Sequence, residues 1–314
     1  MSFRVVFVSF YSKKDVVVTK RMVFMSNVKN SPREEKNKVE KNTLYLVATP
    51  IGNLADLSER AVKVLSEVDF IAAEDTRNSM RLLTHLGISK PMVSYFEHNK
   101  KERGEQIASR LEAGESCALI TDAGTPAISD PGEDLVALCA ERGIKVSSVP
   151  GACAAIVALT LSGLHTGRFC FEGFLSANKS ERRASLKKLE NEERTMIFHE
   201  APHKLKATLA DMAAAFGGER KISLCRELTK LNEEAFRTTL DGAVEHYEQN
   251  EPRGEYVLVV EGAPEGNSKE DFSEMSIEEH VQSYIDSGMS KMDAIKAAAK
   301  DRGVPKNVIY KEFI

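Results

Sequence analysis

The chain has 314 residues, which is enough for two domains of ordinary size and a small third. Hydrophobic residues make up 42% and charged residues 29%, values typical of a globular protein that exclude a collagen-like, coiled-coil or wholly disordered chain. No apolar run approaches the ~20 residues that a membrane-spanning helix needs. The five cysteines form no CxxC pair, which argues against a disulfide framework or a zinc ribbon and predicts a reducing compartment such as the cytoplasm.

The net charge of −4 conceals an uneven distribution. Residues 1–42 carry ten Lys or Arg and four Asp or Glu, whereas residues 43–314 carry 33 and 43. A nucleic-acid partner would therefore contact local basic patches. Residues 1–42 are expected to form a disordered or mis-annotated N-terminal extension, with Met25 as the natural start. A basic organelle presequence is the alternative, which Asp15 weakens; the apolar stretch is too short for a secretory signal.

From Thr43 onward, apolar runs alternate with segments of helical spacing, which predicts an α/β domain with a mostly parallel sheet over residues 43–150. The predicted strands are 43–48, 70–73, 92–95, 117–121 and 145–149. The predicted helices between them are 56–68, 78–86, 102–111 and 135–140.

A second α/β domain is predicted over residues 151–262, beginning with a helix of small residues at 152–161. Its predicted strands are 169–172, 195–199, 222–226, 237–240 and 256–261. The last two are expected to be adjacent, so this sheet is predicted to be mixed.

Residues 263–275 read as a linker, and residues 276–314 as three short helices resembling a helix-turn-helix module. The module begins with a capping box at Ser276 and Glu279. Its last two helices carry six basic residues, which would suit either contact with RNA or a solvated face.

The segment from Asp122 to Gly132 is the most informative one. It follows a predicted strand, where α/β sheets bind ligands, and contains two Gly, two Pro and two Asp. Gly124 would let the backbone approach a ligand and Thr125 would supply a hydroxyl; the alternative is an ordinary capped turn. The loops 49–53 and 150–155 follow two further strands. Loop 49–53 has neither the GxGxxG nor the GxxxxGK[ST] pattern, so a conventional dinucleotide site or P-loop is not supported. The small residues of loop 150–155 would leave room for a flat or bulky ligand, or allow close helix packing.

Two charged segments are further candidates. Glu74, Asp75 and Arg77 end the second predicted strand, where they could form part of a site, or cap a helix with the arginine solvated. Segment 176–188 has five basic residues and one acid, and could either follow a phosphate backbone or form a solvated helix face. These basic residues are Lys179, Arg182, Arg183, Lys187 and Lys188. The segment 199–203 lacks HExxH spacing and a third ligand, so no metal is expected.

Eight segments together resemble, in the same order, the tetrapyrrole methylase superfamily, and within it the bacterial ribosomal RNA small-subunit 2′-O-ribose methyltransferase I family. The resemblance covers about residues 43–262 and extends to the C-terminal helices. The segments are 46–54, 73–77, 122–132, 150–151, 171–175, 200–203, 226–230 and 253–256.

The resemblance implies two α/β domains with S-adenosylmethionine (SAM) in the cleft between them, a homodimer, and methylation of the ribose 2′-OH of a cytidine in the decoding region of 16S rRNA. The implied cofactor contacts are Pro50, Ala123, Gly124, Thr125, Ile128, Cys153, Ala154 and Glu200. The chain departs from the family pattern at Cys153, Ser176, His199 and Lys204, where Ser, Pro, Tyr and Arg are usual.

Because a ribose hydroxyl is a poor nucleophile, a base or a strong hydrogen-bond acceptor would help the reaction. Our hypothesis is that Asp75 or Glu74 orients or deprotonates the 2′-OH and that Arg77 binds phosphate. Two alternative functions remain. A tetrapyrrole methyltransferase would leave the basic segments without a use, and a non-catalytic ribosome-assembly factor that binds rRNA would have no need of a cofactor loop.

Overall fold

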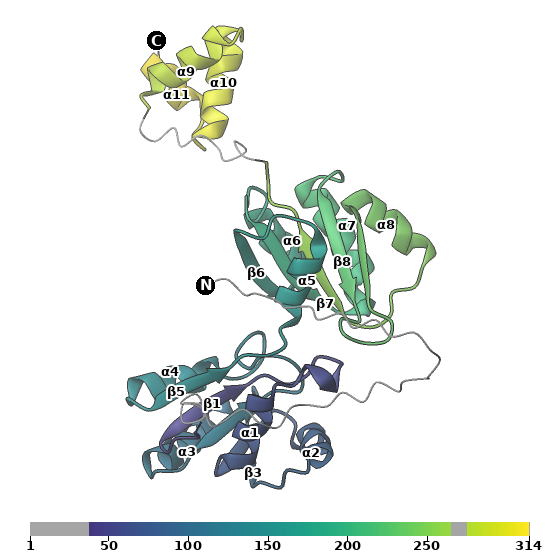
Figure 1. Cartoon of the computed structure of the whole chain (residues 1–314). Coiled ribbons are helices and arrows are strands. Elements are labelled where there is room, and N and C mark those ends of the chain that lie inside the picture. The colour runs from purple at the N-terminus through teal and green to yellow at the C-terminus, as the bar shows by residue number, and fades with distance from the viewer. Residues whose placement is uncertain (1–37, 265–274, 314) are drawn as a thin grey trace, which may run out of the picture. The chain divides into compact units, whose positions relative to one another are not determined.

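The computed structural model describes residues 38–264 and 275–313 (Figure 1). Most of the predicted N-terminal extension and most of the predicted linker lie outside these ranges. No helix within the ranges is long and apolar enough to cross a membrane.

The first sheet has five parallel strands in the order β3-β2-β4-β1-β5. They are β1 (Thr43–Val47), β2 (Phe70–Ala73), β3 (Met92–Ser94), β4 (Cys117–Ile120) and β5 (Lys145–Val149). The predicted strands and their parallel arrangement are therefore confirmed. Connections leave the neighbouring strands β1 and β4 in opposite directions, and this places a crevice at their carboxyl ends, where such sheets bind ligands.

Helices cover both faces of this sheet. Side chains alternate along a strand, so Ile71 of β2 packs with α1 (Glu59–Glu67) and α2 (Thr76–His85), while Phe70 packs with α3 (Lys100–Glu112) and α4 (Glu133–Glu141). Helix α1 begins three residues later than predicted, because the Ser58 hydroxyl accepts a hydrogen bond from Ala61 N and caps it there.

The second sheet is mixed, as predicted, and has the order β6-β7-β10-β8-β9. Its strands are β6 (Phe169–Phe174), β7 (Thr195–Glu200), β8 (Lys221–Arg226), β9 (Glu234–Thr239) and β10 (Tyr256–Val260). Only β6 and β7 run parallel. The predicted adjacency of the last two strands is wrong, because β10 inserts between β7 and β8 and leaves β9 at the edge.

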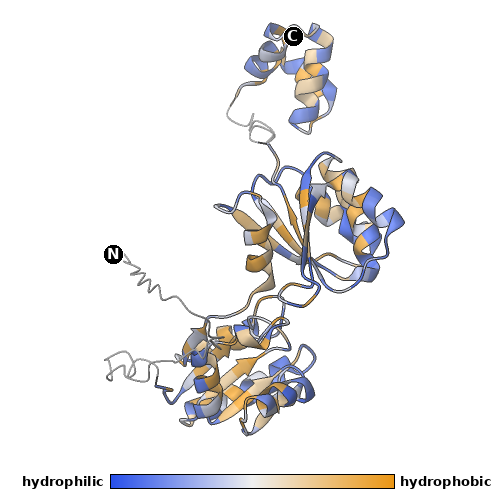
Figure 2. Cartoon of the chain, turned by 45° about the vertical axis from the view of Figure 1, so that its right-hand side comes forward, coloured by the Kyte–Doolittle hydropathy of each residue, from blue (hydrophilic) through white to orange (hydrophobic). Residues whose placement is uncertain are grey.

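One face of the second sheet is covered by α5 (Ala154–Ser162) and the other by α6 (Lys179–Lys188), α7 (Pro202–Phe216) and α8 (Leu240–Gln249). Figure 2 shows α5 almost wholly in the hydrophobic colour, whereas blue marks outer faces of the other three helices. Helices α7 and α8 were not among the predicted elements. The predicted strand 237–240 ends one residue early, because the Thr239 hydroxyl accepts a hydrogen bond from Gly242 N and starts α8.

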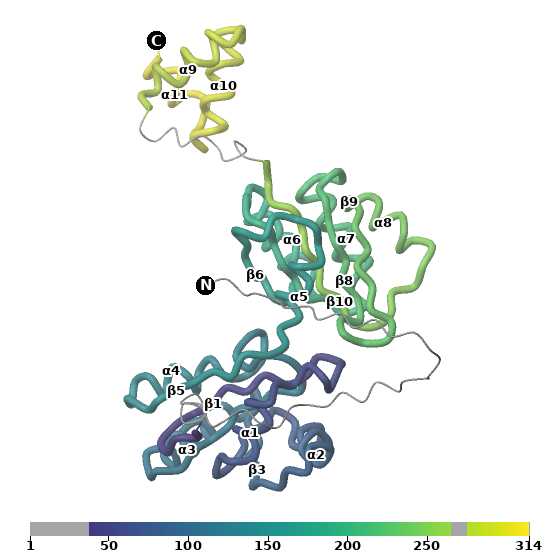
Figure 3. The backbone as a smooth tube through the Cα atoms, in the orientation of Figure 1, coloured from purple at the N-terminus to yellow at the C-terminus, as the bar shows by residue number. Residues whose placement is uncertain are grey.

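The C-terminal module consists of α9 (Ile277–Asp286), α10 (Lys291–Asp301) and α11 (Lys306–Phe313), as the sequence predicts; the tube in Figure 3 follows their short connections. Both halves of the capping box form at Ser276 and Glu279. The helices share a small core of their own, which includes Val281, Ile295 and Ile309.

Candidate functional site

Loops after β1, β4 and β5 are tied together at the carboxyl edge of the first sheet. Thr49 and Gly124 exchange two backbone hydrogen bonds, with N–O distances of 2.9 and 3.1 Å. The Thr125 hydroxyl donates a hydrogen bond to the carbonyl oxygen of Ala152 at 2.9 Å. Gly124 has a φ of +86°, a conformation that favours glycine. Gly124 and Thr125 therefore hold the loops in place, in addition to any contact with a ligand.

A pocket of about 390 Å³ lies where these loops meet the second sheet. Its volume falls within the range of about 300–1,000 Å³ that is typical of small-molecule sites. Its wall combines apolar side chains, such as Ile51, Ile128 and Phe174, with charged ones, such as Lys230. This mixture suits a ligand that has both a flat apolar part and charged groups.

Two strained loops contribute residues to the pocket wall. In the loop after β4, Ala127 and Ser129 have φ values of +67° and +63°; in the loop after β8, Glu227 and Thr229 have values of +50° and +64°. Within the described ranges, the only other non-glycine residue with a positive φ is Asn42. Such strain costs about 1–3 kcal/mol per residue and is concentrated at functional sites. Its position therefore marks the pocket as the candidate site.

Half of the cofactor residues implied by the resemblance line the pocket. They are Ala123, Ile128, Ala154 and Glu200. The other half lie beside it: Pro50 precedes the lining residue Ile51, Cys153 is the N-cap residue of α5, and Gly124 and Thr125 join the loops.

Glu200 is nearly fully buried, and its carboxylate is held from two sides. One oxygen accepts a hydrogen bond from the Thr208 hydroxyl at 2.5 Å, and the other accepts one from Ala201 N at 2.8 Å. Lys204 contributes an ion pair with a 3.4 Å separation. Glu200 is therefore a fixed negative charge in the pocket wall.

His199 lines the pocket. The sequence analysis noted it as a departure from the family pattern and as part of a segment unsuited to a metal. Its ring lies edge-on to Phe171 and Phe174, with centroid distances of 5.1 and 5.3 Å. Burial lowers the pKa of His199, so the imidazole is neutral near pH 7. Its Nε2 atom is buried and has no hydrogen-bond partner among the described residues. A polar group of a bound ligand would satisfy it.

The structure pairs two of the three predicted catalytic residues, Asp75 and Arg77, with each other and gives Glu74 a different partner. Asp75 caps α2, and its carboxylate accepts hydrogen bonds from Arg77 N at 2.8 Å and from the Arg77 guanidinium. These bonds lower the pKa of Asp75 to about 2. Glu74 instead accepts a 3.4 Å hydrogen bond from Asp122 N, at the start of the loop after β4. Arg77 extends into solvent with 87% of its side chain exposed.

A third acidic residue, Asp130, lines the pocket and belongs to the loop that the sequence analysis singled out. Burial, with the nearby charges of Glu74 and Asp122, raises the pKa of Asp130 to about 6. Sequence reasoning missed this residue because every aspartate in a polar loop looks alike without the third dimension. No group of three or more His, Cys, Asp or Glu side chains within residues 38–264 and 275–313 is placed to hold a metal ion.

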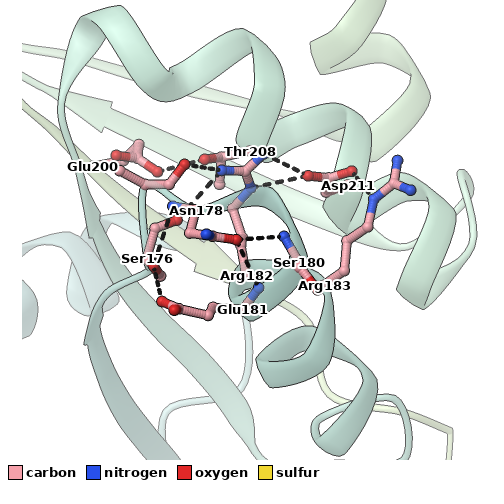
Figure 4. A network of polar contacts seen from close by, with 10 residues as sticks. Ser176, Asn178, Ser180, Glu181, Arg182, Arg183, Glu200, Thr208 and Asp211 are labelled. Atoms are coloured by element: carbon pink, nitrogen blue, oxygen red, sulfur yellow. Dashed lines mark hydrogen bonds and ion pairs between the residues drawn. The ribbon is translucent and has the colours of Figure 1, made fainter.

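The predicted RNA-binding segment folds as α6, and the structure corrects one of its five members. Arg182 points inward and is only 5% exposed; its guanidinium forms an ion pair with Asp211 at 2.6 Å (Figure 4). It also donates hydrogen bonds to the carbonyl oxygens of Ser176 and Ala177. An arginine held in this way cannot reach an RNA phosphate. We therefore assign Arg182 a structural role.

The other four basic residues, Lys179, Arg183, Lys187 and Lys188, stay on the outer surface of α6. Arg183 contacts Asp211 from outside and keeps 57% of its side chain exposed. Lys187 forms only a surface pair with Glu190, at 3.1 Å.

The fold and the pocket define a methylase of the tetrapyrrole type. Residues 43–244 match the family of Tetrapyrrole (Corrin/Porphyrin) Methylases. Within that class, the chain belongs to the ribosomal RNA small subunit methyltransferase I family. It is 47% identical over 268 residues to the Synechocystis protein of that name, covering 85% of this chain and 95% of the relative. It is 44% identical to the Bacillus subtilis protein, covering 88% and 95%. The resemblance stated from the sequence is thus confirmed.

Solved structures support the same fold. A cobalt precorrin-4 methyltransferase superposes with a TM-score of 0.53 at 15% identity, covering 70% of this chain and 95% of the other. A diphthine synthase gives 0.54 at 14% identity, with coverages of 70% and 90%. At these identities the likeness shows the fold alone.

Proposed function

We propose that the protein transfers the methyl group of SAM to the ribose 2′-hydroxyl of a cytidine in the decoding region of 16S rRNA, with the small ribosomal subunit as its substrate. Membership in the ribosomal RNA small subunit methyltransferase I family identifies the class of activity, which is SAM-dependent methylation of rRNA. The observation in this chain that carries the proposal is the pocket walled by two strained loops, one from each sheet.

The residues present fit SAM. The pocket offers apolar side chains for a flat base, the fixed Glu200 carboxylate for a cationic group, and a buried His199 Nε2 that needs a polar partner. The proposed cofactor contacts are those implied by the family resemblance, with Ile51 and His199 added from the pocket. When bound, SAM supplies a methyl group already activated by a sulfonium, so the protein needs chiefly to orient the accepting hydroxyl and to take its proton.

The sequence-based catalytic candidates remain proposals with different expected roles. Glu74 is close enough to the loop after β4 to accept a hydrogen bond from Asp122 N, so it can act near the pocket. The Asp75 carboxylate already accepts hydrogen bonds from the Arg77 guanidinium and from Arg77 N in the first turn of α2. The Arg77 side chain is largely exposed to solvent. Its guanidinium could bind a phosphate after giving up one of its two hydrogen bonds with the Asp75 carboxylate.

RNA binding is proposed for the outer face of α6, through Lys179, Arg183, Lys187 and Lys188. We also propose RNA contact through the C-terminal module, where α10, α11 and their flanks carry six Lys or Arg. The five lysines are exposed, whereas Arg302 donates hydrogen bonds to the carbonyl oxygens of Met275 and Ser276. Deleting residues 275–314 should weaken binding to the small subunit while leaving affinity for S-adenosylhomocysteine (SAH) unchanged. Equal RNA affinity for both forms would remove the module from the proposal.

We also propose a cytoplasmic homodimer. The family resemblance implies the dimer, and we place its interface at α5, a helix of apolar composition whose Ile156 side chain is 44% exposed. Sedimentation of the wild-type chain and of Ile156→Glu should show a dimer and a monomer, respectively. A monomeric wild-type chain would contradict the dimer.

Labelled SAM tests the central proposal. The protein is offered small subunits from cells lacking the gene, naked 16S rRNA and uroporphyrinogen in parallel. Label in an alkali-resistant dinucleotide would establish 2′-O-methylation. Label only in the tetrapyrrole would favour the biosynthetic alternative, and RNA binding without SAM binding would favour a non-catalytic assembly factor.

A further inference from the structure

Asp130 differs from the other acidic residues at the pocket edge in having no bonded partner. Among the described residues, no donor forms a hydrogen bond or ion pair with its carboxylate, although the residue is half-buried in the pocket wall. Asp75 is bonded to Arg77, Asp122 accepts a hydrogen bond from Asn78, and Glu200 is held by Thr208. Asp130 is thus a carboxylate with its accepting capacity unused at a ligand pocket.

The backbone fixes where this carboxylate lies. Ser129, directly before it, has a φ of +63°, and Pro131 follows it. Gly132 has a φ of +149°, and a Cβ there would lie 3.0 Å from the Ala127 side chain. A left-handed residue, a proline and a tightly packed glycine leave Asp130 little conformational freedom, so its position is set before a ligand arrives.

The surroundings make this carboxylate a better proton acceptor than an ordinary aspartate. Partial burial raises the pKa of Asp130, and the negative charges of Glu74 and Asp122, which follow β2 and β4, add to the effect and bring it to about 6. Titratable side chains of the second sheet and its loops also line the pocket. They are His199, the buried Glu200, Cys225, Lys230, Glu255 and Tyr256. At pH 7 to 8 Asp130 is still mostly ionised, so it combines the accepting form with increased basicity.

We infer that Asp130 is the group that accepts the proton of the ribose 2′-hydroxyl, with Glu74 and Asp122 as positioning residues that set its basicity. This inference rests on the proposed function. In the step, the hydroxyl oxygen forms a bond to the methyl carbon while the carbon–sulfur bond breaks, and its electron pair stays on sulfur to give SAH. The hydroxyl proton passes to a carboxylate oxygen of Asp130 and from there to water.

Single-turnover methylation of small subunits lacking the modification tests the assignment, with SAM saturating and pH varied from 5 to 8.5. In the wild type, the rate should rise tenfold per pH unit at low pH and level off above an inflection. Asp130→Asn should lower the plateau rate by about 10²–10⁴-fold and abolish the inflection. Glu74→Gln should move the inflection to lower pH, because one neighbouring negative charge is removed.

Two further measurements separate a chemical role from a structural one. Asp130→Asn should bind SAH and the small subunit as the wild type does, by calorimetry and filter binding, and Asp130→Glu should restore part of the rate. Asp134→Asn is the matched control: its carboxylate is exposed on α4 and paired with Lys100, and it lies outside the pocket. It should keep the wild-type pH profile.

The outcomes are distinct. If the wild type forms 2′-O-methylated RNA but Asp130→Asn keeps the same inflection and a rate within threefold of the wild type, the inference is overturned. If Asp75→Asn rather than Asp130→Asn removes the inflection, the proton acceptor is Asp75. A wild type that forms no 2′-O-methylated RNA overturns the proposed function itself, and the inference with it.

Discussion

The guanidinium of Arg182 on α6 and the carboxylate of Asp211 on α7 form a buried ion pair between these two helices, which cover one face of the second sheet. The N–O distance is 2.6 Å, and the two side chains are 6% and 4% exposed. The second carboxylate oxygen accepts a hydrogen bond from Arg183 at 2.7 Å. Asp211 therefore holds two consecutive arginines of α6, one buried and one at the surface.

Breaking the Arg182–Asp211 pair should destabilise the protein. Arg182→Met would leave the Asp211 carboxylate buried with a single surface partner, and a loss of about 3–5 kcal/mol in the free energy of unfolding is expected. Urea unfolding followed by circular dichroism measures it, since the chain has no Trp. The matched change Arg183→Met, on the exposed side of the same carboxylate, should cost less than about 1 kcal/mol. Equal losses would contradict the distinction.

Neutralising the outer face of α6 should weaken RNA binding and its salt dependence. In a variant with Gln at positions 179, 183, 187 and 188, the slope of log K against log salt should fall by as much as about 0.7 per lost phosphate contact. Filter binding at several salt concentrations gives the slope. Lys63→Gln, which alters an exposed lysine on α1, serves as the control. An unchanged slope would exclude this face from the RNA interface.

Removing the Thr125 hydroxyl should loosen the junction of the loops after β4 and β5. Thr125→Val deletes the hydrogen bond to the Ala152 carbonyl oxygen, and the free energy of unfolding should fall by about 0.5–1.5 kcal/mol. Because the junction borders the pocket, part of that loss should appear as weaker SAH binding, by up to about tenfold. Calorimetry on Thr125→Val and Thr125→Ser separates the hydroxyl from the methyl group. If both bind SAH as the wild type does, the bond does not organise the pocket.

The raised pKa of Asp130 predicts a pH-dependent change in stability. Because the folded-state pKa is about 6 and the ordinary value is 3.8, the folded protein favours the protonated form. The contribution of Asp130 to the free energy of unfolding is therefore fully present below about pH 4 and is lost as the pH rises through 6. Asp130→Asn, which cannot ionise, should be more stable than the wild type at pH 7.5, by no more than about 2 kcal/mol after solvent screening. Near pH 4 the difference should vanish; melting temperatures at both pH values measure it.

Local sequence patterns were sufficient to predict most elements of the fold. Hydrophobic periodicity identified the strands of the first sheet, and the capping box at Ser276 identified the start of α9. These features depend on side chains a few residues apart, so the sequence contains them directly. The order of strands in the second sheet could not be predicted from local patterns. The place of β10 between β7 and β8 depends on pairing between segments far apart in the sequence.

The candidate site divides in the same way. The sequence by itself determined the family and the loop from Asp122 to Gly132, since this loop must hold many constrained residues to keep its shape. Only the tertiary structure decided that Arg182 turns inward to Asp211, that Asp75 is engaged by Arg77, and that Asp130 faces the pocket unpaired. The physical reason is that the reactivity of a charged side chain is set by its burial and by its partners, and these come from segments distant in the chain.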